Sequence, residues 1–390
     1  MKRTECRGCK SGDLTLVYDF GAQPLAGYFP VSRNESLNAK RYPLDLSACM
    51  RCGLMQVTNV PPIEEIFHSQ YRYSTSTVPS LVRHFDAYAE WICGVVDAGA
   101  RILEFGCNDG VLLRFLSDRG FHCKGIDASG NMVQLARAKG LDVDEGFFNE
   151  DYVDKERLDE SFDLVTCSNV FAHVDNLRSV TAAAWRALKL GGMFLVEVHN
   201  AEKIWTEGQF DTIYHEHLTY FSSDTLAFHL QLNGFDVLST DHTPMHGGSL
   251  RVLSRKRRPS AAATGSVSAR RLVPDLLSAT IRRSIDVAKK ELLEIRREYG
   301  AVFGYGAAGR AQMFINMTET ADIFSCVFDD STFRQNRFVA GTGVPIRAFG
   351  QPDIPGALVV LAWNYAEDIV PRTKQYFDGS FTILPTLRAW

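Results

Sequence analysis

Apolar positions between residues 81 and 198 follow two alternating patterns. Apolar side chains at about 81–95 recur every three or four residues, which is typical of an amphipathic helix, and the apolar run 101–105 before a glycine predicts a strand. The pattern then predicts strands and helices in turn at 123–127, 131–139, 162–167, 181–190 and 193–198. Repeated β-α units predict a parallel, doubly wound α/β sheet, with ligand sites beyond the carboxyl ends of its strands.

A second β-α series follows farther along the chain. A helical pattern over 276–292 leads to apolar runs at 301–305, 326–329 and 357–363, which predict a smaller Rossmann-like lobe. The residues between the two series, 255–272, are polar with basic clusters and are interpreted as a solvated linker. We interpret the two lobes as distantly similar structures built from the same kind of β-α series.

Length and composition predict a multi-domain globular protein. A chain of 390 residues exceeds the size of one hydrophobic core, and 45% apolar with 23% charged residues is an ordinary globular balance. We expect three domains, at residues 1–70, 71–255 and 256–390, of which the last is the Rossmann-like lobe.

The charge balance bears on partners and location. The chain has 42 basic and 46 acidic residues, for a net charge of −4, so no large positive field is available to hold nucleic acid. No leader-like start and no apolar run near ~18 residues is present, which predicts no membrane partner and a cytoplasmic location. Cysteines there stay reduced, so their spacing is interpreted first as metal or packing chemistry.

Four of the nine cysteines form two CxxC pairs, Cys6-Cys9 and Cys49-Cys52. Two such pairs can surround one tetrahedral zinc ion, and a closed sphere of four thiolates indicates a structural site. The alternative is four buried apolar cysteines, which the paired spacing disfavours. The intervening segment is too small for a core of its own, so metal binding would supply folding energy.

A glycine turn joins the strand at 101–105 to the next helix. The pattern Glu104-x-Gly106-x-Asn108-x-Gly110 resembles the first motif of class I methyltransferases. Glycines let the backbone approach a ligand closely, and Asp127 ends the next strand, where a carboxylate accepts hydrogen bonds from ribose hydroxyls. The spacing differs from the dinucleotide fingerprint, so S-adenosylmethionine is favoured over NAD.

Reactive side chains are densest at residues 211–222. Histidine, tyrosine and glutamate there can remove a proton, stabilise an oxyanion and orient an imidazole. His215-x-His217 lacks the third ligand of a catalytic zinc site, and no HExxH pattern is present. The alternative interpretation is an amphipathic segment that carries these polar groups on its wet face.

From Cys6 to Trp363 the chain resembles the sugar C-methyltransferase family, which methylates carbon 3 of nucleotide-linked 4-keto deoxysugars. The resemblance rests on the two CxxC pairs and on the segments 104–110, 210–222 and 246–251. Further matches lie at 304–307, 328–329, 341, 344–346 and 363–364. Arg310-Ala311, Asn336 and Ala340 depart from the family pattern, which affects the nucleotide or sugar identity more than the reaction type.

The resemblance implies a role for each matched residue. His217 is the leading general base, Tyr214 an alternative base or enolate partner, and Glu216 an orienting or substrate-contacting carboxylate. His173 is expected to project from the end of a strand toward the same crevice, and Tyr73 to close over the sugar. The expected cofactor-binding residues are Glu104, Phe105, Gly106, Asn108, Gly110, Asp127 and Asn169. The expected substrate-binding residues are His246, Gly306, Arg310, Asp329 and Trp363.

The C-terminal lobe leaves two interpretations open. Gly304-x-Gly306-x-x-Gly309 follows a strand and fits the dinucleotide spacing, which allows an oxidoreductase lobe. Under the family resemblance, its amides and Arg310 instead hold the substrate's diphosphate. The rival functions are a methyltransferase for another small molecule, for protein or for nucleic acid, and a non-catalytic scaffold. We expect a monomer or weak dimer.

Overall fold

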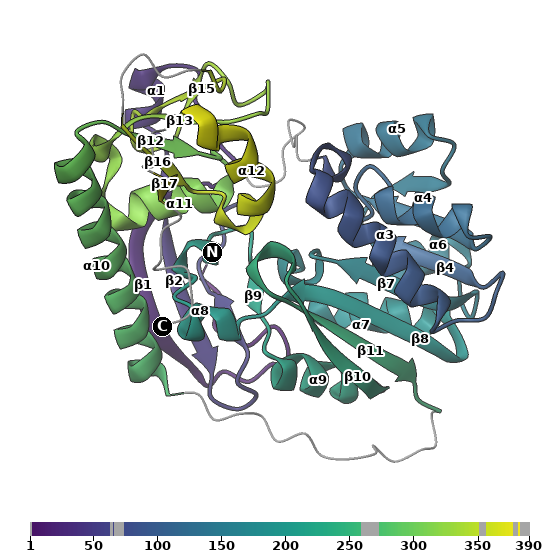
Figure 1. Ribbon diagram of the computed structural model, residues 1–390. Coiled ribbons are helices and arrows are strands. Elements are labelled where there is room, and N and C mark those ends of the chain that lie inside the picture. Colours follow the sequence, from purple (N-terminus) through teal and green to yellow (C-terminus); the bar gives the residue numbers. More distant parts are fainter. Residues whose placement is uncertain are drawn as a thin grey trace.

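The computed structural model describes residues 2–62, 65, 74–258, 273–350, 356–376 and 381–382. Its strands form a four-stranded, a seven-stranded and a six-stranded sheet. Figure 1 shows two bodies: the N-terminal strands (purple) lie with the C-terminal lobe (green to yellow), and the seven-stranded sheet forms the other body.

The seven-stranded sheet has the order β10-β11-β8-β7-β4-β5-β6. Its strands are β4 (Arg101–Phe105), β5 (His122–Asp127), β6 (Val143–Glu145), β7 (Phe162–Ser168), β8 (Leu188–His199), β10 (Phe235–Thr243) and β11 (Ser249–Lys256). Its helices are α3 (Pro79–Cys93), α4 (Val111–Asp118), α5 (Gly130–Ala138), α6 (Glu150–Glu156), α7 (Leu177–Ala187), α8 (Glu202–Thr206) and α9 (Ser223–Leu232). Strands β4 to β8 pair in parallel and β11 is antiparallel to both neighbours, which confirms the doubly wound α/β prediction.

One predicted helix boundary is wrong. The helix expected to reach residue 190 ends at Ala187, and β8 begins at Leu188. Leu188 is fully buried and pairs with Phe162 of β7. The sheet pairing, which the local apolar spacing does not report, therefore overrides the helical pattern.

The N-terminal sheet depends on other parts of the chain. It contains β1 (Leu14–Pro24), β2 (Arg41–Cys49), β3 (Met55–Val57) and β9 (Thr219–Tyr220). Helix α1 (Arg33–Leu37) comes between β1 and β2 in the order of the chain. Val17 and Leu44 share one apolar core with Ile281 and Leu292 of α10 (Pro274–Tyr299). The C-terminal lobe thus completes the core that the short N-terminal segment lacks.

The six-stranded sheet has the order β14-β15-β13-β12-β16-β17. Its strands are β12 (Val302–Tyr305), β13 (Phe324–Phe328), β14 (Arg337–Phe338), β15 (Pro345–Arg347), β16 (Ala357–Val360) and β17 (Phe381–Thr382), and its other helices are α11 (Gly309–Thr318) and α12 (Ala366–Thr373). Its glycine turn repeats that of the larger sheet. The Gly106 amide donates, at 2.7 Å, to the carbonyl of the residue before Asp127, which ends β5. The Gly306 amide donates, also at 2.7 Å, to the carbonyl of the residue before Asp329, which directly follows β13.

Part of the predicted solvated linker is anchored instead. Lys256 is buried, its ammonium donates to the Leu188 carbonyl at 2.7 Å, and it lies 4.1 Å from the Trp185 ring centroid. The Arg257 guanidinium pairs with Asp236 at 3.0 Å. A long basic side chain can pack its stem on an aromatic ring while its charge meets a carbonyl, which sequence composition does not reveal.

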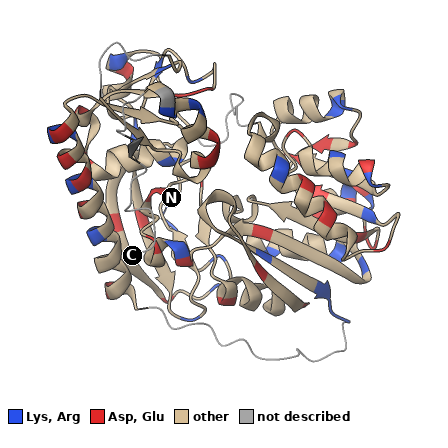
Figure 2. Cartoon of the chain, in the orientation of Figure 1, with Lys and Arg blue, Asp and Glu red and all other residues tan. Residues whose placement is uncertain are grey.

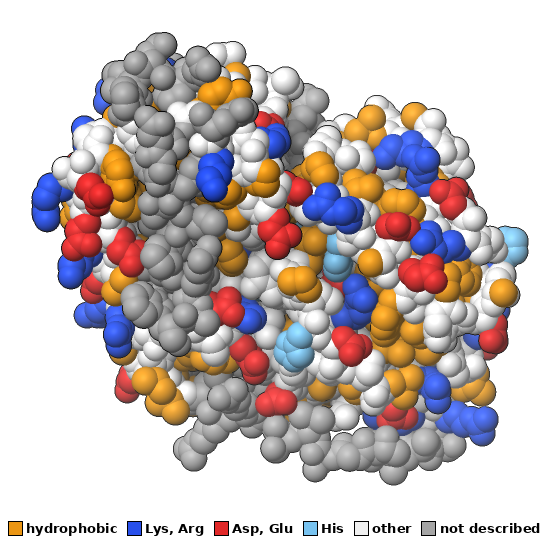
Figure 3. All heavy atoms as spheres, in the orientation of Figure 1, with side chains coloured by type: hydrophobic (Ala, Val, Ile, Leu, Met, Phe, Trp, Pro, Cys, Tyr) orange, Lys and Arg blue, Asp and Glu red, His pale blue; other side chains and the backbone are white. Residues whose placement is uncertain are grey.

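Charge is distributed evenly over the fold. Figure 2 shows basic and acidic residues intermixed along α10 and along the helices of the larger sheet. The face in Figure 3 mixes apolar and charged side chains, with an indentation between the two bodies at its upper edge. Among the described helices, none combines the length and apolar character needed to cross a bilayer.

Candidate active site and metal centre

A cavity of about 1490 Å³ lies between the two bodies. Its wall takes residues from the glycine turn after β4, from the 212–218 segment, from the first turn of α11 and from the N-terminal residues 26–29. Small-molecule pockets usually measure about 300–1,000 Å³, so this cavity has room for more than one ligand.

The turn after β4 forms one end of the cavity. Gly106 has a φ of +66°, and a Cβ there would lie 2.2 Å from Val170, so only glycine fits. Glu104 is buried, and one of its carboxylate oxygens has no partner among the described residues. Burial, then the nearby Asp127, raises the pKa of Glu104 to about 8. Asp127 accepts from the amides of Asn108 and Ser129, both at 2.8 Å. An unpartnered buried acid beside a glycine cradle fits a ligand with a cationic amino-acid end and a ribose.

Three other predicted cofactor residues have different surroundings. Phe105 lines the cavity and stacks on Phe148 with centroids 4.8 Å apart, and Asn169 lines it with a φ of +56°. Gly110 is not among the wall residues: it caps α4 with a φ of +77°, and a Cβ there would lie 2.3 Å from Leu141. Gly110 is therefore needed for packing of the turn.

Phe147 and His199 are two of the wall residues that the sequence pattern did not predict. Phe147 follows β6 and is 60% exposed, although it is a large aromatic side chain lining the cavity. His199 ends β8 and lies within hydrogen-bond reach of the Gln209 side chain, with Nε2 and Oε1 2.9 Å apart. The position of His199 at the carboxyl end of a strand was the available sequence signal.

Tyr214 and His217 form a hydrogen-bonded pair in the cavity wall. The His217 Nδ1 lies 2.8 Å from the Thr212 carbonyl, which can only accept, so Nδ1 carries the proton. The Tyr214 hydroxyl then donates to the lone pair of His217 Nε2 at 2.7 Å. Burial, followed by the neighbouring His173, lowers the pKa of His217 well below its ordinary value. The imidazole is therefore held neutral, as a base must be.

His173 and Glu216 flank this pair. The His173 Nδ1–H donates to the Glu216 carbonyl at 2.7 Å, and the His173 and His217 rings meet edge to face at 4.9 Å. One carboxylate oxygen of Glu216 accepts from the Gly27 amide at 3.1 Å, and the other has no partner in the part of the chain that the structure describes. Burial raises the pKa of Glu216 to about 7. Tyr73, the remaining predicted catalytic residue, lies outside the described residues.

Arg310 lines the cavity, but its guanidinium is largely occupied. It forms a two-point ion pair with Asp211, with distances of 2.9 and 2.7 Å, and donates to the carbonyl of His246 and the side chain of Gln209. Among the described residues, four of its five N–H groups have partners, which leaves one N–H group for a ligand. Trp363 is not a wall residue: its ring lies 4.7 Å from the Arg310 guanidinium and its N–H donates to Asp211 at 3.2 Å. Both residues thus fix the segment that precedes Tyr214.

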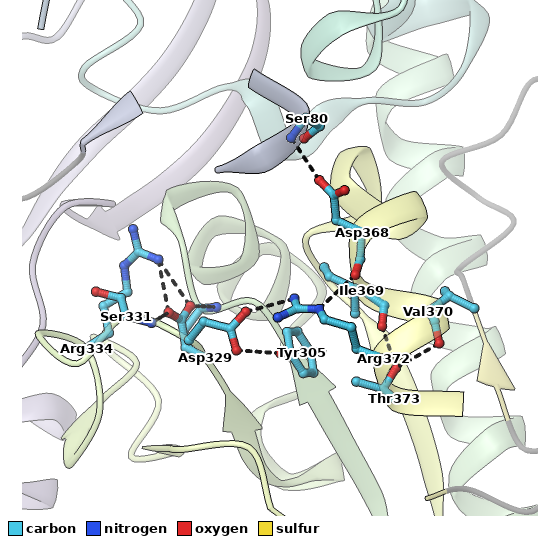
Figure 4. Close-up of polar contacts among 12 residues, drawn as sticks. Ser80, Tyr305, Asp329, Ser331, Arg334, Asp368, Ile369, Val370, Arg372 and Thr373 are labelled. Carbon is cyan, nitrogen blue, oxygen red and sulfur yellow. Dashed lines mark hydrogen bonds and ion pairs between the residues drawn. The ribbon is translucent and has the colours of Figure 1, made fainter. Parts of the chain in front are cut away.

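The glycine turn of the C-terminal lobe faces the cavity through Gly306 and the first turn of α11, whose N-cap residue has no side-chain cap bond. Gly306 has a φ of +89°, and a Cβ there would lie 2.3 Å from Ala362. Asp329 is not a wall residue: it accepts from the Ala307 amide at 2.7 Å and from Arg334 at 3.2 Å, as Figure 4 shows for Arg334. The Arg334 guanidinium thus lies within hydrogen-bond distance of both carboxylate oxygens of Asp329.

His246 completes the predicted set and lines the cavity. It has a φ of +55°, and its Nδ1 lies 3.2 Å from the Tyr365 hydroxyl. Burial lowers the pKa of His246 to about 4, so the ring stays neutral.

A polar contact joins α12 of one body to α3 of the other. The Asp368 carboxylate of α12 accepts from the Ser80 amide of α3 at 3.2 Å (Figure 4). It also accepts from Arg83 at 3.0 Å. On the same helix, Arg372 pairs with Asp330 at 2.9 Å.

The four CxxC cysteines form a compact cluster. Their sulfur atoms lie within 4.8 Å of one another, with Cys6 and Cys52 3.6 Å apart and Cys9 and Cys49 3.5 Å apart. Four thiolates bound at ~2.3 Å to one tetrahedral zinc have comparable spacings. The cluster thus fits a structural zinc ion.

Three family models match successive parts of the chain: "Putative zinc binding domain" at residues 6–67, "Methyltransferase domain" at 83–240 and "C-methyltransferase C-terminal domain" at 244–385. "C-methyltransferase NovU" of Streptomyces niveus is 28% identical over 411 residues, covering 98% of this chain and 95% of that protein.

A shorter similarity involves "Ubiquinone biosynthesis O-methyltransferase" of Hahella chejuensis, 37% identical over 99 residues, covering 24% of this chain and 40% of that protein. The structure of magnesium protoporphyrin IX methyltransferase (ChlM) from Synechocystis PCC 6803 with bound SAM is 15% identical, with a TM-score of 0.36, covering 45% of this chain and 79% of that one. From the family models and the full-length similarity, the chain belongs to the S-adenosylmethionine-dependent C-methyltransferases with an N-terminal zinc module and a class I methyltransferase fold.

Proposed function

We propose that the protein transfers the methyl group of S-adenosylmethionine to carbon 3 of a nucleotide-linked 4-keto deoxysugar. The observation that carries the proposal is the Tyr214–His217 pair, which lies in the same cavity as Glu104 and the first turn of α11. In this proposal residues 1–70, 71–255 and 256–390 are the zinc module, the cofactor domain and the sugar-nucleotide lobe.

The hydrogen on carbon 3 is acidic because the adjacent carbonyl can take up the electron pair as an enolate. The Tyr214 oxygen accepts this proton while its own proton passes to His217 Nε2, whose lone pair already receives that hydroxyl. The products of this step are an enolate and an imidazolium. S-Adenosylmethionine supplies the electrophilic methyl group, which carbon 3 of the enolate takes from sulfur.

Two neighbours support the pair in this proposal. His173 holds the backbone of Glu216 next to His217, and the unpartnered Glu216 oxygen is available to a sugar hydroxyl. Since burial raises the pKa of Glu216 to about 7, this carboxyl group can accept or donate a hydrogen bond near neutrality. Glu216 therefore orients the sugar, as the family resemblance implies.

The C-terminal lobe would hold the diphosphate. The uncapped first turn of α11 presents amide donors to the cavity, and Arg334 stands beside it with one guanidinium nitrogen on Asp329. Asp329 would be the ribose acceptor of a dinucleotide site, but the Arg334 guanidinium already pairs with both of its carboxylate oxygens. This favours a nucleoside diphosphate over NAD.

The test is a panel of nucleotide-linked 4-keto deoxysugars incubated with S-adenosylmethionine carrying a deuterated methyl group. We expect mass spectrometry to detect a deuterated methyl on carbon 3 of at least one member, and His217→Asn to abolish it. A methyl group found on oxygen, or on none of the sugars, would contradict the proposal and favour another small-molecule acceptor.

Competition separates the two interpretations of the C-terminal lobe. We expect a nucleoside diphosphate to displace the substrate and NAD to leave it bound, both followed by calorimetry. Displacement by NAD alone would instead identify an oxidoreductase-type lobe.

A further inference from the structure

The catalytic segment is also a strand of the N-terminal sheet. Thr219 and Tyr220 form β9, which pairs with Gln56 and Met55 of β3. The Val57 amide extends this ladder by donating to the Leu218 carbonyl at 3.1 Å. His217 therefore directly precedes residues whose backbone is held by the zinc module, and β9 lies between the two bodies in Figure 1.

Arg7 connects the zinc ligands to this segment. It lies between Cys6 and Cys9, and its side chain is 0% exposed. Its Nη1 donates to the Val57 carbonyl at 2.7 Å and lies 3.4 Å from the Leu218 carbonyl. One guanidinium thus joins the metal site, β3 and the residue after His217.

The Arg7 guanidinium also contacts the segment that carries His173. The Arg7 Nε donates to Asp175 at 3.0 Å, two residues after His173. His173 in turn donates to the Glu216 carbonyl and meets the His217 ring. Arg7 therefore holds both backbone segments whose relative position sets the distance between the two imidazoles.

Burial of Arg7 is an expensive way to stabilise a fold. Its Nη2 is buried and has no partner within the described residues, and the side chain of Asp175 is 52% exposed. Apolar side chains often replace buried charges without loss of stability. Such a side chain would fill the space of Arg7 but could not join the three backbone segments by directed hydrogen bonds.

We infer that Arg7 is a positioning residue through which the zinc module sets the geometry of His217 and His173. This inference rests on the proposed function for its consequence in catalysis, but its structural content can be tested without any sugar. The zinc ion contributes by fixing the Cys6–Cys9 turn from which Arg7 projects.

The test compares full-length, zinc-loaded Arg7→Met and Arg7→Lys with Arg257→Met. Arg257 is the matched control because it is also largely buried, with one carboxylate and two carbonyl partners, and lies away from the cavity. Long-range NMR of ¹⁵N-histidine-labelled protein reports which imidazole nitrogen carries the proton, and the His217 signals are identified by their loss in His217→Asn.

In the wild type and in the control we expect His217 to be protonated at Nδ1 alone. Arg7→Met should mix the two tautomers while zinc content and S-adenosylhomocysteine affinity stay unchanged, and Arg7→Lys should recover part of the wild-type signal. Unchanged His217 signals in Arg7→Met would overturn the inference. If that variant does not fold, Arg7→Lys decides by the same criterion.

Activity gives the second readout. A displacement of about 1 Å in a catalytic group can cost ~100-fold in rate, so we expect Arg7→Met to lower kcat by about 10–100-fold with KM for S-adenosylmethionine unchanged. If the wild type itself methylates no keto sugar, the proposed function fails while the NMR result still tests Arg7. If the wild type is active and Arg7→Met has the same kcat, the positioning role is wrong.

Discussion

The hydrogen bond from Tyr214 to His217 makes a quantitative prediction about proton transfer. In the proposed relay, Tyr214→Phe removes the group that meets the substrate proton and His217→Gln removes its final acceptor. Because the Tyr214 hydroxyl and the His217 Nε2 lie 2.7 Å apart, the proposed relay uses both groups in the same step. Acid–base catalysis contributes about 10²–10⁴-fold, so each single variant should lose roughly 3–5 kcal/mol of transition-state stabilisation.

The double variant distinguishes a relay from two independent effects. If the two groups act as one unit, the double variant should be no more than about tenfold slower than the slower single variant, because the second change removes nothing that still functions. If each acts alone, the losses should multiply. A multiplied loss would refute the relay.

The assay is single-turnover methyl transfer at saturating ligands, accompanied by uptake of deuterium from solvent at carbon 3 without S-adenosylmethionine. Tyr152→Phe is the control, because its hydroxyl also makes one short bond, 2.8 Å to Asp144, but outside the cavity wall. We expect that control to cost about 1 kcal/mol of stability and no activity. Because the pKa of His217 is lowered, the acidic limb of kcat/KM should lie below pH ~6.5.

Four other predictions follow. Cys49→Ser should abolish stoichiometric zinc and lower the Tm, and a retained full zinc content by metal analysis would argue against the four-cysteine site. Because burial raises the pKa of Glu104 to about 8, binding of the cofactor's ammonium group should release a proton at pH 7, and calorimetry in two buffers should find no release in Glu104→Gln. In the folded chain Glu216 keeps its proton up to about pH 7, whereas in the unfolded chain it loses the proton at its lower, ordinary pKa, so the stability of the fold decreases as the pH rises between these two pKa values. Glu216→Gln should therefore raise the Tm at pH 8 but not at pH 4. Equal shifts of Tm at the two pH values would contradict this linkage. Asp368→Asn should speed amide exchange in the first turn of α3, and unchanged protection of Ser80 would show that the contact does not hold the two bodies together.

Features with local causes were predictable. The parallel sheet follows from helical spacing alternating with short apolar runs, and the Gly106 turn follows from a backbone position that only glycine can occupy. The CxxC spacing predicted the cysteine cluster, because each pair places both sulfurs on one turn. The Tyr214–His217 pair also lies within one short segment, so its proximity was visible in the sequence.

Long-range contacts decided the roles of several other residues. Arg310, predicted to contact a diphosphate, lines the cavity and donates two of its five N–H groups to Asp211, 99 positions earlier. Asp329, predicted to contact substrate, is not among the wall residues of the cavity and pairs with Arg334. In both cases the sequence identified a residue with the appropriate chemistry, while the tertiary structure determined which side chain of the protein it contacts.

The sequence alone determined the element types, the cofactor turn, the metal ligands and the reactive segment, because each depends on neighbours a few residues apart. Tertiary structure alone decided that the N-terminal strands pack on α10, that β9 joins the zinc module, and that Arg7 reaches both Asp175 and Leu218. Those contacts join residues up to hundreds of positions apart, and they form only when separate apolar faces are buried together, which local spacing does not encode.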